Sequence, residues 1–161
     1  MDIPLLSGIM VNDEDKYLYA LIISVSDKFK KISQSYEDSA SVLEKEIKYL
    51  CSSKSSEKYR VYYDKLSDVF NIVSLRKKAS MYKLISEILK KSVDSMIVNK
   101  KKIGRYKKKL EDFVNGKIDL EEATNLILTF LKNVLGIDIS KDKYYEVGEY
   151  EARKHFEDIC S

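Results

Sequence analysis

The fold of this chain is decided by one long stretch, residues 57–97, which reads EKYRVYYDKLSDVFNIVSLRKKASMYKLISEILKKSVDSMI. Apolar side chains recur in it every three or four residues, the spacing that places them on one face of an α-helix. Neither glycine nor proline interrupts the pattern, and the whole chain of 161 residues holds one proline and five glycines. The stretch predicts either one long helix or two helical segments, and we favour two, with a bend near residues 71–74.

The same spacing predicts further helices on both sides of this stretch. They are expected at about residues 13–32, 38–51, 100–114 and 120–135. Asn12 and Asp15 have the pattern of a helix start, and Asp119 with Glu122 has the pattern of a capping box. Gly116 is placed to end the helix before it.

The regular helical spacing of apolar residues stops after Gly136. A short strand is expected at residues 143–147 and a short terminal helix from about residue 149. The sequence therefore predicts an all-α fold, a helical bundle of about six or seven helices with a small C-terminal appendage. We expect residues 1–136 to form the helical domain and residues 137–161 the appendage.

Several classes of protein are excluded by what the sequence lacks. No run of 18 apolar residues is present to span a membrane, and no secretory signal is recognisable at the start. We therefore expect a cytoplasmic protein with no membrane contact. Cys51 and Cys160 are the only cysteines, and a disulfide between them is not expected in the cytosol.

No motif for catalysis, metal binding or cofactor binding is found. His155 is the single histidine, so a metal centre or a nucleophile with its general base lacks partners. Glycine-rich phosphate-binding loops are absent as well. We expect no enzyme activity, no cofactor, no metal and no small-molecule substrate.

Charge is segregated along the chain. The net charge is +3, yet residues 54–110 carry 17 basic and 5 acidic side chains, a net charge of +12, whereas the flanking stretches are acidic. Between positions 100 and 109 seven of ten residues are lysine or arginine. The middle of the chain is therefore the place to look for an anionic partner.

Ten basic residues of this middle are candidate nucleic-acid contacts. Around residues 100–113 the apolar residues form one helical stripe, made of Ile103, Tyr106, Leu110 and Phe113. We expect this stripe to pack inward and to leave the basic residues outside. The candidates are Arg76, Lys77, Lys78, Lys100, Lys101, Lys102, Arg105, Lys107, Lys108 and Lys109.

Three interpretations of these residues stay open. They can contact nucleic-acid phosphates, with tyrosines of the same region stacking on unpaired bases. They can be an ordinary solvated helix face, since lysines spread around a helix keep a protein soluble. The segregation of charge also suits docking onto other protein subunits in a hetero-oligomer.

Residues 55–88, SSEKYRVYYDKLSDVFNIVSLRKKASMYKLISEI, resemble the long central helices of subunits of the GINS replication complex. Leu75 and the following basic residues, Arg76, Lys77 and Lys78, are the matching positions. The resemblance implies a helical domain followed by a small β-rich domain, in a heterotetrameric scaffold that joins the replicative helicase to another activating factor without catalysis. The 25 residues after Gly136 are fewer than a complete β-rich domain needs.

The sequence thus predicts a non-catalytic helical subunit of a multiprotein complex that handles nucleic acid, in the manner of a GINS-like DNA replication scaffold. Two alternatives fit its size, helicity and basic faces. One is the small helical subunit of an RNA-guided CRISPR effector, which binds nucleic acid. The other is a viral helical protein that binds a host protein.

Overall fold

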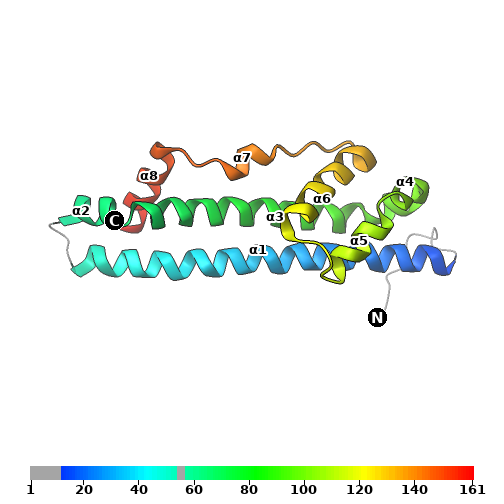
Figure 1. The fold of residues 1–161 in the computed structure, drawn as a ribbon, viewed down its shortest axis with the longest axis horizontal. Coiled ribbons are helices and arrows are strands. Elements are labelled where there is room, and N and C mark those ends of the chain that lie inside the picture. The colour runs from blue at the N-terminus through cyan, green and yellow to red at the C-terminus, as the bar shows by residue number, and fades with distance from the viewer. Residues whose placement is uncertain (1–11, 54–56) are drawn as a thin grey trace. The chain divides into compact units, whose positions relative to one another are not determined.

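The computed structural model describes residues 12–53 and 57–161, and this part of the chain contains eight helices and no strand (Figure 1). In chain order the helices are α1 (Asp13–Ser53), α2 (Lys58–Asp64), α3 (Leu66–Val98), α4 (Lys100–Gly104), α5 (Lys107–Val114), α6 (Leu120–Leu135), α7 (Lys141–Tyr145) and α8 (Glu149–Ile159). The predicted all-α fold is confirmed. The β-rich domain implied by the resemblance to GINS subunits is not found among the described residues.

The chain forms two compact units, each built from two separated stretches. Unit 1 contains the described residues up to Lys30 together with Leu84–Ile139, and unit 2 contains Lys31–Lys83 together with Ser140–Ser161. Residues 1–136, expected as one helical domain, contribute to both units. The expected appendage, 137–161, lies almost entirely in unit 2.

Helix α1 runs without a break through the polar stretch SQSYED, residues 33–38, where the sequence predicts an end. Asn12 caps it as predicted, because its side-chain oxygen accepts the amide of Asp15 at 2.9 Å. The prediction of a break is wrong because Ser33 does not serve as a cap. Its side chain is buried, and its hydroxyl donates instead to the Ala79 carbonyl at 2.7 Å.

The bend expected near residues 71–74 is also not present, because α3 continues through it. Ile72 and Val73 are buried there and follow the helical stripe. The chain divides earlier, at Lys65, between α2 and α3. Even at this point the amide of Lys65 donates to the Val61 carbonyl at 2.9 Å, so the interruption is a single residue.

The strand expected at residues 143–147 is wrong. Residues up to Tyr145 form α7, and the amide of Glu146 donates to the Asp142 carbonyl at 3.1 Å, a helical hydrogen bond. A strand needs a neighbouring strand to satisfy its backbone groups, and the described residues supply none. The terminal helix expected from about residue 149 is present as α8.

Helix α6 has the ends that the sequence predicts. Asp119 is the N-cap, and its carboxylate accepts the amide of Glu122 at 2.8 Å. At the other end Gly136 adopts a left-handed conformation with φ of 69°, which glycine reaches without a steric penalty. Gly116, two residues after the end of α5, has φ of 73°, in agreement with its predicted place at a helix end.

The core of unit 1 joins aromatic rings with a pair of buried serines. Phe29 of α1 stacks on Phe113 of α5 with ring centroids 4.6 Å apart. Ser26 of α1 and Ser86 of α3 each donate a hydroxyl to the other's carbonyl at 2.8 Å. These small side chains satisfy each other's polar groups while α1 and α3 approach closely.

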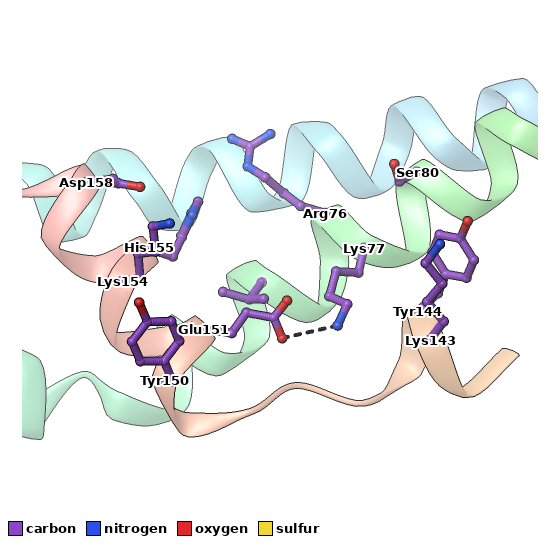
Figure 2. A pocket seen from close by; sticks show the side chains of 11 residues that line it. Arg76, Lys77, Ser80, Lys143, Tyr144, Tyr150, Glu151, Lys154, His155 and Asp158 are labelled. Carbon is purple, nitrogen blue, oxygen red and sulfur yellow. Dashed lines mark hydrogen bonds and ion pairs between the residues drawn. The ribbon is translucent and has the colours of Figure 1, made fainter. Parts of the chain in front are cut away.

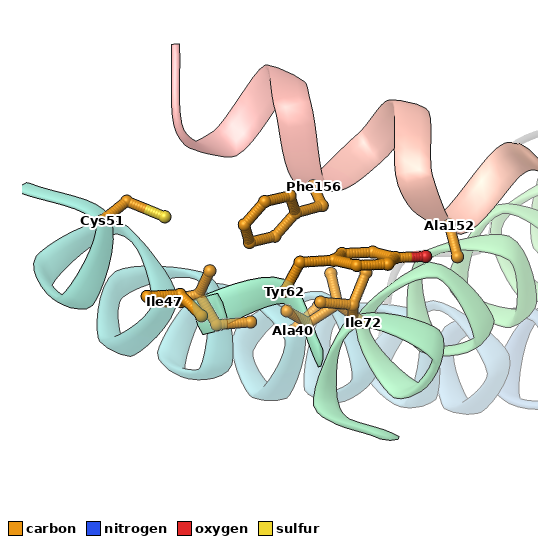
Figure 3. Packing of buried hydrophobic residues seen from close by; sticks show 9 residues of the cluster. Ala40, Ile47, Cys51, Tyr62, Ile72, Ala152 and Phe156 are labelled. Carbon is orange, nitrogen blue, oxygen red and sulfur yellow. The ribbon is translucent and has the colours of Figure 1, made fainter. Parts of the chain in front are cut away.

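The core of unit 2 gathers apolar side chains from four helices (Figure 3). Tyr62 of α2 meets Phe156 of α8 edge-on, with ring centroids 4.9 Å apart. Both side chains are almost fully buried, as is Ala152 one turn before Phe156. Helix α8 is therefore a part of this core.

A disulfide between Cys51 and Cys160 closes unit 2. Cys51 lies near the end of α1, and Cys160 directly follows α8. The expectation that these cysteines stay unpaired is wrong, because the fold brings residues 109 positions apart to a Cα separation of 5.7 Å. That separation is what a disulfide requires.

Candidate nucleic-acid interface

The basic segment of residues 100–109 folds into two short helices instead of the single helix that its spacing predicts. Helix α4 ends at Gly104, α5 begins at Lys107, and in the turn between them the Tyr106 amide donates to the Ile103 carbonyl at 2.8 Å. Glycine costs about 1 kcal/mol relative to alanine inside a helix, which makes Gly104 a favourable place for this interruption.

The apolar stripe of this segment is buried as predicted. Ile103, Leu110 and Phe113 are each at most 3% exposed. Tyr106 is half-buried, and its ring meets the Phe130 ring of α6 edge-on at a centroid distance of 5.2 Å. Packing of this stripe fixes which sides of α4 and α5 remain for the basic residues.

Two of the seven basic side chains are occupied by partners on α1. The Lys100 ammonium lies 3.2 Å from the carboxylate of Asp15, whose side chain is only 6% exposed. The Lys107 ammonium lies over the Tyr17 ring, 5.0 Å from its centroid. The Tyr17 hydroxyl donates to Glu111, and this hydrogen bond, together with partial burial, raises the pKa of Tyr17. Lys100 and Lys107 therefore attach the segment to α1.

Lys108 has a weaker partner within its own helix. Its ammonium lies 3.4 Å from the Asp112 carboxylate, one turn along α5, and the Lys108 side chain is 81% exposed. Such a surface pair stabilises a helix by about 0.3–0.5 kcal/mol. For the other four basic residues the described part of the chain provides no ion pair or hydrogen bond. These exposed residues are Lys101, Lys102, Arg105 and Lys109.

The four unpaired cations line two adjacent hollows between α4–α5 and α6. One hollow, of about 330 Å³, has Lys101, Lys102 and Arg105 on its walls. The other, of about 360 Å³, has Arg105 and Lys109. Because Arg105 and Tyr106 line both hollows, we treat them as one feature, the basic groove.

The α6 wall of the basic groove carries amide and hydroxyl groups. Asn125, Thr129 and Asn133 follow one another at intervals of four residues, so they share one face of α6. The Asn133 amide donates to the Tyr106 hydroxyl at 2.8 Å, and the Thr129 hydroxyl donates to the Asn125 carbonyl at 2.9 Å. Positive charge on one wall thus faces groups that both donate and accept hydrogen bonds on the other, together with the carboxylate of Glu122.

The basic residues of α3 that belong to unit 2 contact groups of the protein itself. Arg76 binds the Glu44 carboxylate through two nitrogens, at 2.8 and 2.6 Å, and it also pairs with Glu37. A bidentate arginine–carboxylate pair is directional and strong. Arg76 therefore connects α3 to α1 inside unit 2.

Lys77 and Lys78 also have partners in unit 2. The Lys77 ammonium lies 3.1 Å from the Glu151 carboxylate of α8 and donates to the Glu146 carbonyl at 2.6 Å. Lys78 lies over the Tyr145 ring of α7, 4.8 Å from its centroid. The ten candidates are therefore divided between the units, three in unit 2 and seven in unit 1.

Glu44 is the centre of a charged cluster in unit 2. The Arg76 guanidinium, through its hydrogen bonds, lowers the pKa of the Glu44 carboxyl. Burial opposes this shift, and the hydrogen bond from His155, with 2.9 Å between His155 Nε2 and Glu44 Oε1, adds to it. His155, the single histidine of the sequence, is thus held against a carboxylate that lies 111 positions away.

The described residues hold no group of three or more histidine, cysteine, aspartate or glutamate side chains placed to bind a metal ion. In the same residues no helix has the length and apolarity needed to cross a membrane.

The polar α6 stripe is what reasoning from the sequence missed. A signal for it exists in the four-residue spacing of Asn125, Thr129 and Asn133. The leucines of α6 hide this signal, because they place apolar residues on nearly every side of the helix. In the structure Leu126 and Leu128 are only half-buried, which leaves room for the polar stripe at the groove.

Comparison with known proteins found no matching family model, no matching curated protein and no matching solved structure.

Proposed function

We propose that this chain is a non-catalytic helical subunit of a nucleic-acid-handling complex, and that unit 1 contacts the phosphate backbone through the basic groove. The observation that carries the proposal is the set of four exposed cations without partners along one groove. Cations already neutralised by carboxylates release no counterions on binding, whereas unpaired ones do. The resemblance of residues 55–88 to GINS subunits favours a scaffold role within such a complex.

The chemistry of the second wall supports a nucleic acid over other polyanions. Asn125, Thr129 and Asn133 present amides and hydroxyls beside Lys101, Arg105 and Lys109. Such side chains commonly hydrogen-bond phosphate and sugar oxygens, and these contacts position a protein without reading sequence. The proposal is therefore binding to the backbone with little base specificity.

Salt dependence tests this proposal. If each of the four unpaired cations neutralises one phosphate, log K falls against log salt with a slope of about −3.6 on duplex DNA and about −2.8 on single strands. Fluorescence anisotropy with labelled DNA and RNA oligonucleotides, at several salt concentrations, measures the slope. Absence of binding at low salt would remove the proposal.

A matched pair of triple variants locates the binding surface. Replacing Lys101, Arg105 and Lys109 with alanine is expected to make the duplex slope shallower by about 2.7. The control replaces Lys30, Lys90 and Lys91, which are exposed lysines of unit 1 outside the groove, and changes the net charge equally. Equal losses of affinity in both variants would mean that binding depends on the net charge of the protein and not on the groove.

Partner proteins are the second part of the proposal. Val42 and Tyr49 of α1 are 67% and 71% exposed, and their separation of seven residues places them on one face of the helix. Exposed apolar side chains such as these are of the kind that an interface with another subunit covers. Capture from the native lysate, with Val42→Asp as the comparison, is expected to recover partners with the wild-type chain and to lose them with the variant.

The cytoplasmic location expected from the sequence stays a proposal, and the disulfide is an argument against it. Cytosolic thiols are kept reduced in most organisms, although intracellular proteins of hyperthermophiles are an exception. Trapping thiols with an alkylating agent as cells are lysed measures the state of Cys51 and Cys160. Two free thiols would favour the reducing cytosol.

A further inference from the structure

Unit 2 contains a hollow of about 640 Å³ that the proposed function does not use (Figure 2). Its walls are formed by α3 on one side and by α7 and α8 on the other. The volume falls within the range of about 300–1,000 Å³ that is usual for ligand sites. A ligand can use those lining side chains that are not already paired within the protein.

Four of the residues that line the hollow are already paired. Lys77 and Glu151 form an ion pair at 3.1 Å, drawn as a dashed line in Figure 2. Arg76 and His155 both bind Glu44. These four lining residues are therefore satisfied within the protein and give the hollow a polar wall of fixed geometry.

The groups at the rim are aromatic and basic, and they occur in two pairs. On α8, Tyr150 is 80% exposed, and Lys154 lies four residues later on the same side of the helix. On α7, Lys143 lies 5.6 Å from the ring centroid of its neighbour Tyr144. Figure 2 shows Tyr150 and Tyr144 on opposite sides of the Lys77–Glu151 pair. Each end of the hollow thus has one aromatic ring and one cation. At the α7 end Lys143 covers one face of the Tyr144 ring, so a base stacks there only on the other face.

An aromatic ring beside a cation fits an unpaired nucleotide. The ring stacks on the base, the ammonium attracts the phosphate, and every base has a face for such stacking. In a duplex the bases are already stacked on their neighbours and not available. Two such pairs of a ring and a cation favour a strand of at least two nucleotides over a single small molecule.

We propose that this hollow of unit 2 binds single-stranded nucleic acid, with Tyr150 and Tyr144 stacking on bases and Lys154 and Lys143 contacting the adjoining phosphates. The inference rests on the proposed function for the class of ligand, and it adds a second site with a preference for unpaired strands. Glu151 and Asp158 also line the hollow, so the contact extends over few phosphates. DNA and RNA share the chemistry invoked here.

The test uses the full chain and four probes: a 12-nucleotide DNA strand, the RNA strand of the same sequence, the corresponding DNA duplex and a mononucleotide. Tyr150→Ala is expected to weaken binding of the strands by about 5-fold to 150-fold, the range for loss of one stacked base. Binding of the duplex is expected to change less than twofold. Tyr150→Phe keeps the ring and is expected to bind like the wild type.

Matched controls separate the site from general effects of exposed residues. Tyr59 of α2 is 66% exposed, belongs to unit 2 and lies outside the hollow, so Tyr59→Ala is the control for Tyr150→Ala. Lys48→Ala, at an exposed lysine of α1 in unit 2, is the control for Lys154→Ala. The expected result is a loss of strand binding in the variants of the hollow and none in the controls.

The outcomes distinguish this inference from the proposed function. If Tyr150→Ala and Lys154→Ala bind strands like the wild type while the triple variant of the basic groove is defective, the hollow is not a site and the proposed function stands. If the mononucleotide binds as tightly as the strands, a small-molecule site replaces the strand site. Equal weakening of duplex and strands by Tyr150→Ala would also overturn the inference.

Discussion

Arg76 in unit 2 and Arg105 in unit 1 come from basic clusters that look alike in the sequence but have opposite surroundings. Arg76 is held by two carboxylates of α1, whereas Arg105 is exposed in the basic groove and has no ion-pair partner among the described residues. A basic cluster is thus a candidate binding surface where its cations form no ion pair with a carboxylate of the fold, as is the case for Arg105 although Glu122 lines the same hollow.

The units also differ in how their last helices are held. Helix α6 of unit 1 is held by capped ends and by buried rings such as Phe130. Helix α8 of unit 2 is held by Phe156 and in addition by a disulfide, by the ion pair of Glu151 with Lys77 and by the hydrogen bond of His155 with Glu44. A change in redox state should therefore act on unit 2 and leave unit 1 largely unaffected.

Loss of the disulfide is expected to have the largest effect. Replacing Cys51 and Cys160 with serine, or adding reductant, is expected to lower the free energy of unfolding by about 2–4 kcal/mol, because the bond closes a long loop in the unfolded chain. Hydrogen exchange is expected to increase in peptides of α8 and not in those of α6. Equal increases in both helices would break the proposed contrast between the units.

Removal of Arg76 is expected to have an intermediate effect. Arg76→Ala leaves Glu37 and Glu44 without their guanidinium partner and is expected to lower the free energy of unfolding by about 1–2 kcal/mol. Arg105→Ala is the comparison, with an expected change of less than about 0.5 kcal/mol. Urea unfolding measures both. Similar losses in the two variants would mean that Arg105 is also used inside the protein.

Acidification is expected to give the smallest effect. The pKa of Glu44 in the folded chain lies below its ordinary value, chiefly because of Arg76. The charged Glu44 therefore contributes its full stabilisation above its unfolded pKa of about 4.3, and this is lost as the pH falls through the lower folded pKa.

Comparison of the wild type with Glu44→Gln isolates that contribution. The difference in their free energies of unfolding is expected to be largest at neutral pH, less than about 1 kcal/mol because the group is partly exposed, and to shrink below pH of about 4. Urea unfolding at neutral pH and at two acidic values measures it. A difference that grows on acidification would contradict the pKa direction.

Features that depend on neighbours within about one helical turn can be predicted from the sequence alone. The all-α class, the caps at Asn12 and Asp119 and the burial of Ile103 and Leu110 all follow from local spacing. The basic segment of residues 100–109 was found in the same way, because charge and periodicity can be read directly from the chain.

Which of these cations lack an ion-pair partner depends on contacts between residues far apart in the chain. Glu44 lies 32 positions from Arg76 and 111 from His155, and Cys51 lies 109 from Cys160. No local rule pairs residues at such distances, because packing of whole helices brings them together. For the same reason Ser33 lies inside a continuous helix instead of ending it: its hydroxyl finds a carbonyl on α3 that the sequence does not reveal.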